Sequence, residues 1–143
     1  MRKLALIVVV LSAGLLFIKP IAASAHGTDS HGGTIDAQMK KLHDMMPVFT
    51  AASAELKSAL DKGDIAAAKA PAGKIMAAIP DLKKSKPHKN IKQRKKFVEL
   101  ATKFEETVTS TVELIKKDDL SGAKAAFKKV EEVCAACHAK FRD

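Results

Sequence analysis

The stretch TIDAQMKKLHDMMPVFTAASAELKSAL, residues 34–60, determines the fold. Its apolar side chains recur three or four positions apart, with Ser53 as one weak position: Ile35, Met39, Leu42, Met46, Phe49, Leu56 and Leu60. This spacing places them on one face of an α-helix, and that face needs a partner to bury it. Thr34 is the expected N-cap, Pro47 is expected to kink the helix, and Lys62-Gly63-Asp64 should end it and cap the next one.

Three further segments show the same helical periodicity. The second helix has core positions at Ile65, Ala68, Ala72, Ile75 and Ile79. After a basic connection from Pro80 to Pro87, the third has Phe97, Ala101, Phe104, Val108 and Ile115. The fourth, from about Asp119, has Leu120, Ala123, Phe127, Val130, Cys134, Cys137 and Phe141. We therefore expect an all-α fold, an antiparallel up-down-up-down four-helix bundle.

An internal echo supports pairing these helices into two hairpins. DIAAAKA at residues 64–70 reappears 55 positions later as DLSGAKA at 119–125, and Phe49 and Phe104 match at the same offset. Two helical hairpins of similar design explain the echo. Convergence on good helix-capping sequence explains it equally well.

Composition limits the chain to one small domain. It has 143 residues, 25 Lys and Arg against 16 Asp and Glu, a net charge of +9, seven Gly and neither Trp nor Tyr. A chain of this length excludes a large barrel or a two-domain enzyme. Abundant Ala and Lys with little Gly favour helices.

The N-terminus has the pattern of a secretory signal peptide, residues 1–25. Arg2 and Lys3 precede an apolar run of 15 residues, 4–18, and small residues follow at 23–25. A retained membrane anchor is the alternative, but the run is shorter than the roughly 20 residues that span a bilayer. We therefore expect an exported protein.

Residues 26–33, HGTDSHGG, are expected to be a flexible segment ahead of the bundle at 34–143. A new amino terminus at His26, with His31 nearby, offers ligands for Cu(II) or Ni(II) as an alternative. Imidazoles in loose tails are also common without any metal.

The chemistry concentrates in Cys134-Ala135-Ala136-Cys137-His138. Two thiols three positions apart, followed at once by a histidine, match the c-type haem attachment pattern. On a helix these three side chains share one side, so both thiols can reach the haem vinyl groups while His138 reaches the iron.

Three other sites compete for the two cysteines. A zinc site needs about four ligands, and no second cluster is present. A thioredoxin-like pair should follow a strand in a βαβ pattern, which is absent. A structural disulfide needs only the cysteines, and none of the three explains a histidine at position 138 of an exported bundle.

These residues give the chain a resemblance over Thr34 to Asp143. The terminal C-x-x-C-H resembles the class II c-type cytochromes, which include cytochrome c′. The N-terminal half is more similar to the cytochrome b562 family, whose first helix opens with a Met followed three residues later by a Leu, as Met39 and Leu42 do here. That family also ends with a Cys-His pair and an aromatic-Arg pair, as Cys137-His138 and Phe141-Arg142 do here. The resemblance implies one haem with Met39 and His138 as axial ligands. Cytochrome b562 binds its haem without thioethers, so Cys134 departs from that pattern.

Helix geometry also favours Met39. An antiparallel fourth helix that ends near residue 141 returns His138 to the level at which the first helix starts. Three alternatives stay open: Met39 only packs in the core, the iron is five-coordinate, or His43, one turn later, binds it. Met45 and Met46 lie deeper in the helix.

Other side chains have weaker expected roles at the haem. Phe97 should form an apolar wall beside the macrocycle, and Arg142 should pair with a propionate. His26, His31 and His88 are expected at the surface.

The resulting functional hypothesis is a periplasmic cytochrome, not an enzyme, that carries one electron on a single covalently attached haem c with His138 and Met39 as ligands. The alternative is a five-coordinate, cytochrome c′-like haem protein that binds nitric oxide or carbon monoxide. A non-haem metal-binding or scaffold bundle is the third possibility.

The basic connection suggests the kind of partner. Its Lys and Arg side chains should lie at the haem end: Lys83, Lys84, Lys86, Lys89, Lys92, Arg94, Lys95 and Lys96. Such a patch attracts acidic periplasmic redox proteins, although a solvated basic loop explains it equally well. An exported protein should meet no nucleic acid, and no membrane once the signal is removed. A monomer and a homodimer are both compatible with the sequence.

Overall fold

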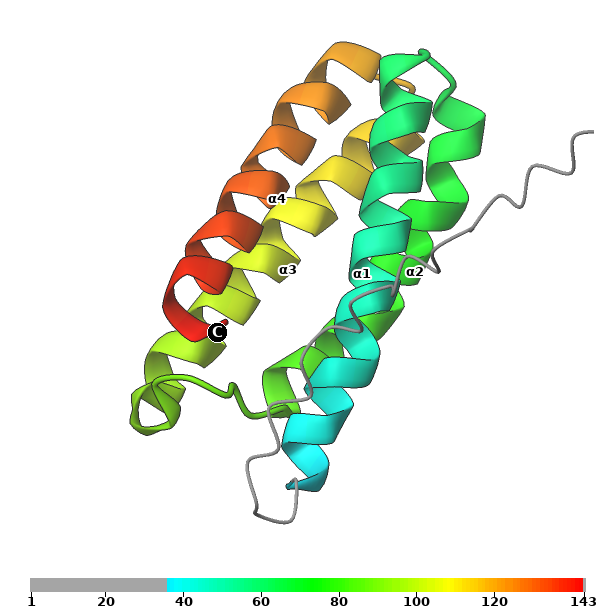
Figure 1. Cartoon of the computed structure of the whole chain (residues 1–143). Helices are drawn as coiled ribbons and strands as arrows, with labels where there is room; N and C mark the ends of the chain where they lie inside the picture. The colour runs from blue at the N-terminus through cyan, green and yellow to red at the C-terminus, as the bar shows by residue number, and fades with distance from the viewer. Residues whose placement is uncertain (1–35, 143) are drawn as a thin grey trace, which may run out of the picture. The chain divides into compact units, whose positions relative to one another are not determined.

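The computed structural model describes residues 36–142, which form four α-helices, one short 3-10 helix and no strand (Figure 1). The elements are α1 (Ala37–Asp61), α2 (Ile65–Lys84), η1 (Ile91–Gln93), α3 (Arg94–Lys116) and α4 (Leu120–Phe141). The predicted all-α class and four-helix bundle are confirmed. The predicted signal peptide and flexible segment, with Thr34 and Ile35, lie outside the described residues.

The start of α1 differs from the expectation. Asp36, not Thr34, is the N-cap, and its Oδ1 accepts a hydrogen bond of 2.9 Å from the backbone N–H of Gln38. A carboxylate at this position also interacts favourably with the positive end of the helix dipole. The helix then continues through Pro47 to Asp61.

The two tight turns at the far end use the same capping device. Gly63 adopts φ +75° after α1, and Asp64 then caps α2 by accepting a 2.8 Å hydrogen bond from the Ala67 N–H. Asp119 caps α4 in the same way, at 2.8 Å from the Gly122 N–H. Both aspartates come from the echoed segments, so the echo marks the two hairpin turns.

The second helix is longer than predicted, because Pro80 does not end it. α2 runs through Pro80 to Lys84. Pro80 is exposed, while Ile79 and Leu82 on either side of it are buried in the core. This burial stabilises the helix, although Pro80 removes one backbone hydrogen bond from it. The connection to α3 is therefore confined to residues 85–93.

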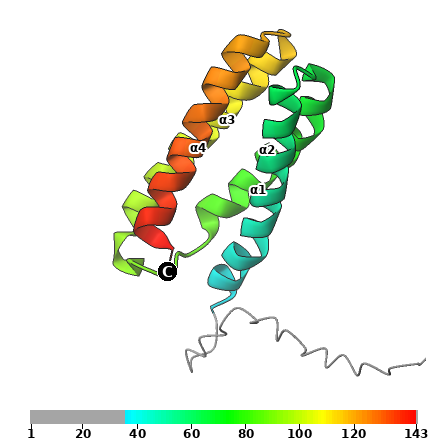
Figure 2. The same ribbon diagram turned by 45° about the horizontal axis from the view of Figure 1, so that its top comes forward.

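The bundle consists of two hairpins, α1 with α2 and α3 with α4, joined mainly where α2 packs on α3 (Figure 2). Phe49 of α1 and Phe104 of α3 meet edge to face with ring centroids 5.3 Å apart. In contrast, α1 touches α4 at only a few positions. The seam between the first and last helices is thus the least packed part of the bundle.

Two glycines give a matched test of the fold. Gly63→Ala forces a side chain into the left-handed region and should lower the free energy of unfolding by about 1 kcal/mol. Gly73→Ala lies inside α2, where an added Cβ meets nothing within 4 Å, and should raise it by about 0.5 to 1 kcal/mol. Denaturant unfolding of both variants measures the change, and equal effects of one sign would contradict these backbone assignments.

Candidate functional site

The last turns of α4 carry the C-x-x-C-H motif on one side of the helix. Cys134, Cys137 and His138 fall within about 100° of its circumference, as the helical repeat of the motif requires. Both cysteines are half-buried and pack against the core, whereas His138 is exposed. The three predicted residues are therefore together, with the thiols directed inward.

The two thiols are free and neutral. They form no disulfide. Burial raises the pKa of Cys134 to about 11, with Cys137 and Glu131 adding to the effect, and burial also raises the pKa of Cys137. Metal binding requires thiolates, so these pKa shifts disfavour a zinc site. Within the described residues, no three His, Cys, Asp or Glu side chains gather as metal ligands.

The surroundings of His138 favour its neutral imidazole. Desolvation lowers its pKa, and the nearby positive charge of Arg142 lowers it further. A lower pKa keeps the imidazole neutral to more acidic pH, and only a neutral nitrogen can ligate a metal. Arg142 also ends the helix, because its backbone N–H donates a 3.0 Å hydrogen bond to the His138 carbonyl.

The α2–α3 connection is tied to the start of α1. The backbone N–H of Lys86 lies 3.4 Å from the Gln38 carbonyl. The Lys86 ammonium also pairs with the Asp36 carboxylate at 2.5 Å, and this pair lowers the pKa of Asp36. The residue that caps α1 is thus held by the connection.

The same connection is tied to the end of α4. The Asn90 side-chain amide donates a 2.6 Å hydrogen bond to the Lys140 carbonyl, and the Lys89 N–H lies 3.5 Å from the Phe141 carbonyl. Residues 86–90 therefore span the end of the bundle from α1 to α4. This confirms that the connection, the start of α1 and the end of α4 share one end.

Arg94 fixes where the connection leaves α2. Its guanidinium donates hydrogen bonds to the carbonyls of Lys83, at 2.6 Å, and of Ser85. The same group lies 5.5 Å from the centroid of the Phe97 ring. Arg94 thus satisfies the last carbonyls of α2 and holds them against α3.

Met39 and His43 of α1 lie at this end but in different surroundings. Met39 is half-buried in the first turn of α1, at the end of the bundle where α4 finishes. His43 is exposed, and its ring meets that of His88 edge to face at 4.1 Å between centroids. His88 was expected at the surface, but the structure half-buries it in the connection beside α1.

The aromatic residues expected near the site occupy the core of the same end. Phe97 is 2% exposed and meets Phe141 edge to face, with centroids 5.4 Å apart. Phe141 lies one turn after Cys137, so the pair backs the inward side of the motif. Arg142, in contrast, is exposed beyond the last turn.

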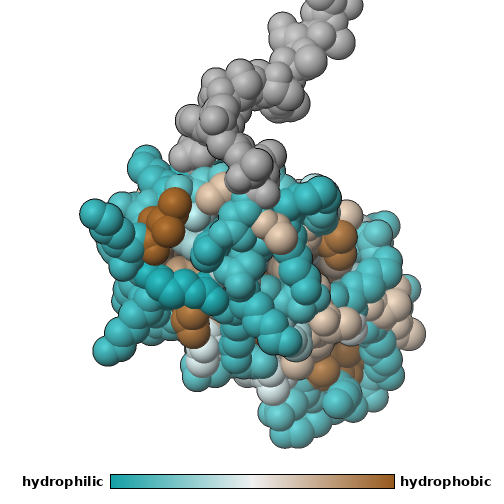
Figure 3. All heavy atoms as spheres, turned by 90° about the horizontal axis from the view of Figure 1, so that it is seen from below, coloured by the Kyte–Doolittle hydropathy of each residue, from teal (hydrophilic) through white to brown (hydrophobic). Residues whose placement is uncertain are grey.

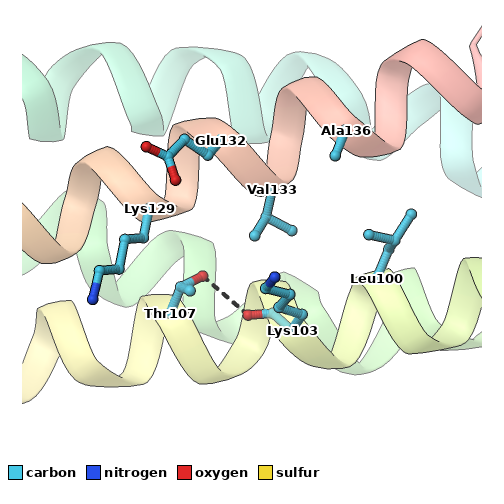
Figure 4. A pocket seen from close by; sticks show the side chains of 7 residues that line it. All are labelled: Leu100, Lys103, Thr107, Lys129, Glu132, Val133 and Ala136. Atoms are coloured by element: carbon cyan, nitrogen blue, oxygen red, sulfur yellow. Dashed lines mark hydrogen bonds between the residues drawn. The ribbon is translucent and has the colours of Figure 1, made fainter.

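A shallow groove lies between α3 and α4 (Figure 4). Leu100, Val133 and Ala136 form its apolar part, and charged side chains such as Lys129 and Glu132 border it. Ala136 points about 200° away from Cys134 around the helix, whereas Val133 lies one turn before Cys137 on the same face. The groove therefore borders the face of α4 that carries Cys137, although neither cysteine lines it.

No helix in the described part of the chain has an apolar stretch long enough to cross a bilayer. The contacts of the connection between α2 and α3 with α1 and α4 form the structural frame of the candidate site.

Comparison with known proteins gives one match. Residues 81–142, which include α3 and α4, match the model of the family described as Cytochrome C'. No curated protein and no solved structure gives a significant match. The family binds an iron-containing haem, and the neutral thiols and imidazole on one side of α4 suit such a group. The matched segment and the four-helix fold together fit a class II cytochrome, a haem-binding four-helix bundle.

Proposed function

We propose that the chain is a periplasmic one-electron carrier with one haem c, covalently attached through Cys134 and Cys137 and ligated by His138 and Met39. The observation that carries the proposal is the side of α4 that bears two inward thiols and an imidazole. It lies at the end of the bundle where α1 begins, and α1 makes few contacts with α4 along its length. When bound, the haem supplies the Fe(III)/Fe(II) couple.

Each residue has a distinct role in this proposal. Cys134 and Cys137 fix the porphyrin to α4, so the protein retains it in an exported environment. His138 holds the iron from α4 and Met39 holds it from α1. Two protein ligands keep the iron geometry similar in both oxidation states, which suits electron transfer.

A gas-binding function is the second candidate, and the Cytochrome C' match favours it. In that case Met39 packs beside the haem without binding iron, and nitric oxide or carbon monoxide occupies the open position. The two candidates share the cysteines and His138 and differ at one coordination position. We also propose that residues 1–25 direct export of the protein and that its redox partners are acidic proteins. A monomer and a homodimer are both compatible with this function.

Covalent attachment is tested on protein coexpressed with the c-type maturation machinery. The wild-type mass should exceed that of the processed chain by one haem, and acidified organic solvent should extract no haem. Cys134→Ala and Cys137→Ala should each retain a single thioether or lose the haem. Ser121→Ala, exposed at the far end of α4, is the matched control and should keep full attachment. A wild-type chain at its bare mass would refute the c-type assignment.

The distal ligand is tested with Met39→Ala, His43→Ala and His88→Ala in the haem-loaded protein. We expect a low-spin wild-type spectrum, and only Met39→Ala should become high-spin and bind carbon monoxide. The reduction potential of that variant should fall, because a thioether ligand favours a higher potential.

The other outcomes assign the position differently. A wild-type protein that is already high-spin and binds carbon monoxide would replace the His/Met proposal with the gas-binding function. If Met39→Ala stays low-spin while one histidine variant does not, that histidine is the ligand.

A further inference from the structure

We infer that the surface around η1, formed by Lys89, Ile91, Lys92 and Lys95, docks an acidic redox protein next to the haem. This η1 surface rests on the proposed electron-transfer function and names the place where the partner binds. It is narrower than the basic run in the sequence, because the structure separates the lysines that serve the fold from those left available.

Four of the eight basic side chains of that run already interact with other groups of the chain. Lys83 pairs with Glu105, Lys86 with Asp36 at 2.5 Å, and Lys96 with Glu99 at 2.6 Å. Arg94 donates to backbone carbonyls. Within residues 36–142, the remaining four have no ion pair: Lys84, Lys89, Lys92 and Lys95.

Three of these lysines lie close in the chain to an exposed apolar side chain. Ile91 is 50% exposed, and in the described residues only Val48 is another large hydrophobic side chain exposed to this degree. Lys89, Lys92 and Lys95 are exposed and lie within four positions of Ile91 at the start of α3. An apolar contact bordered by charge is the usual arrangement of a protein interface.

The η1 surface is held in place before any partner arrives. Asn90 adopts φ +56°, and its side-chain amide bonds to the Lys140 carbonyl at 2.6 Å. The Gln93 N–H closes the turn on the Asn90 carbonyl at 2.7 Å. A fixed surface loses less conformational entropy when it binds.

These same contacts place the η1 surface beside the haem-binding residues. Asn90 and Lys89 contact Lys140 and Phe141, which lie within one turn of His138 on α4. Figure 3 views the bundle from this end, where hydrophilic side chains predominate and hydrophobic patches are small and separate. A partner seated on η1 therefore approaches the end of α4 that carries the haem.

The composition of the η1 surface favours an acidic protein over other polyanions. Single-stranded nucleic acid binds through exposed aromatic side chains, but Phe97 and Phe141, the nearest rings, are buried. Stable membrane association combines basic residues with a broad apolar face or a lipid anchor, and η1 offers one isoleucine. Three lysines around one apolar contact match a carboxylate-rimmed protein surface.

The test uses the haem-loaded protein and an acidic blue-copper protein as the probe. Ferrous haem gives one electron to Cu(II), which yields Fe(III) and Cu(I), and loss of the blue absorbance reports the rate. Binding is measured separately by calorimetry with the probe in its Cu(I) form. The triple variant Lys89→Glu/Lys92→Glu/Lys95→Glu should lower both the affinity and the transfer rate at least about tenfold at low salt. It should also flatten their dependence on ionic strength.

Two control variants make this test specific. Lys69→Glu/Lys117→Glu/Lys124→Glu changes the charge equally at the far end, where these lysines are exposed, and should leave both readouts near wild type. Ile91→Ser should weaken binding several-fold but keep the salt dependence. Equal losses in the two triple variants would overturn the docking site, since net charge alone would then explain the effect.

The outcome is separable from that of the proposed function. Transfer to ferricyanide, a small oxidant, should proceed in every variant if the haem is a competent carrier. A protein that binds the probe through the η1 surface but reduces neither acceptor would refute electron transport while retaining the docking site. Binding to anionic phosphatidylserine vesicles or single-stranded DNA, with no binding to the acidic probe, would overturn the inference.

Discussion

The site depends on the hydrogen bonds that join residues 86–90 to both the first turn of α1 and the last turn of α4. α1 and α4 contact each other little, so side-chain packing between them does not set their separation. Lys86 holds Asp36 and Gln38 on one side, and Asn90 holds Lys140 on the other. These bonds thereby keep the end of α4, which carries the thiols, and the first turn of α1, which carries Met39, at one end of the bundle although the two helices contact each other little.

The residues that the proposal assigns to the inner side of the haem site share an intermediate burial. The side chains of the core are buried, whereas Met39, Cys134 and Cys137 are half-buried. A flat apolar group placed between α1 and α4 would cover these side chains and gain the hydrophobic free energy that the seam does not provide alone. Behind them, Phe97 and Phe141 supply a closed aromatic wall.

Features that depend on the spacing of neighbouring residues could be predicted from the sequence. Features that depend on contacts between residues far apart in the chain could not. Helical periodicity predicted the four helices, and the echo predicted Asp64 and Asp119 at equivalent turns. The predicted end of α2 before Pro80 was wrong, because burial of Ile79 and Leu82 stabilises the helix more than the hydrogen bond lost at Pro80 destabilises it. The pairing of Lys83 with Glu105 depends on where α3 lies, and the half-burial of His88 on how the connection crosses the bundle, so neither could be seen in the sequence.

Hydrogen–deuterium exchange on the apoprotein and the haem-loaded protein tests the central claim most directly, because it locates the haem within the bundle. The account predicts that haem slows amide exchange in the first three turns of α1 and the last three turns of α4. Exchange in the first turns of α2 and at the α3–α4 turn should stay unchanged. Protection concentrated in the α3–α4 groove around Leu100 and Val133, with none gained by α1, would contradict a haem held between the first and last helices.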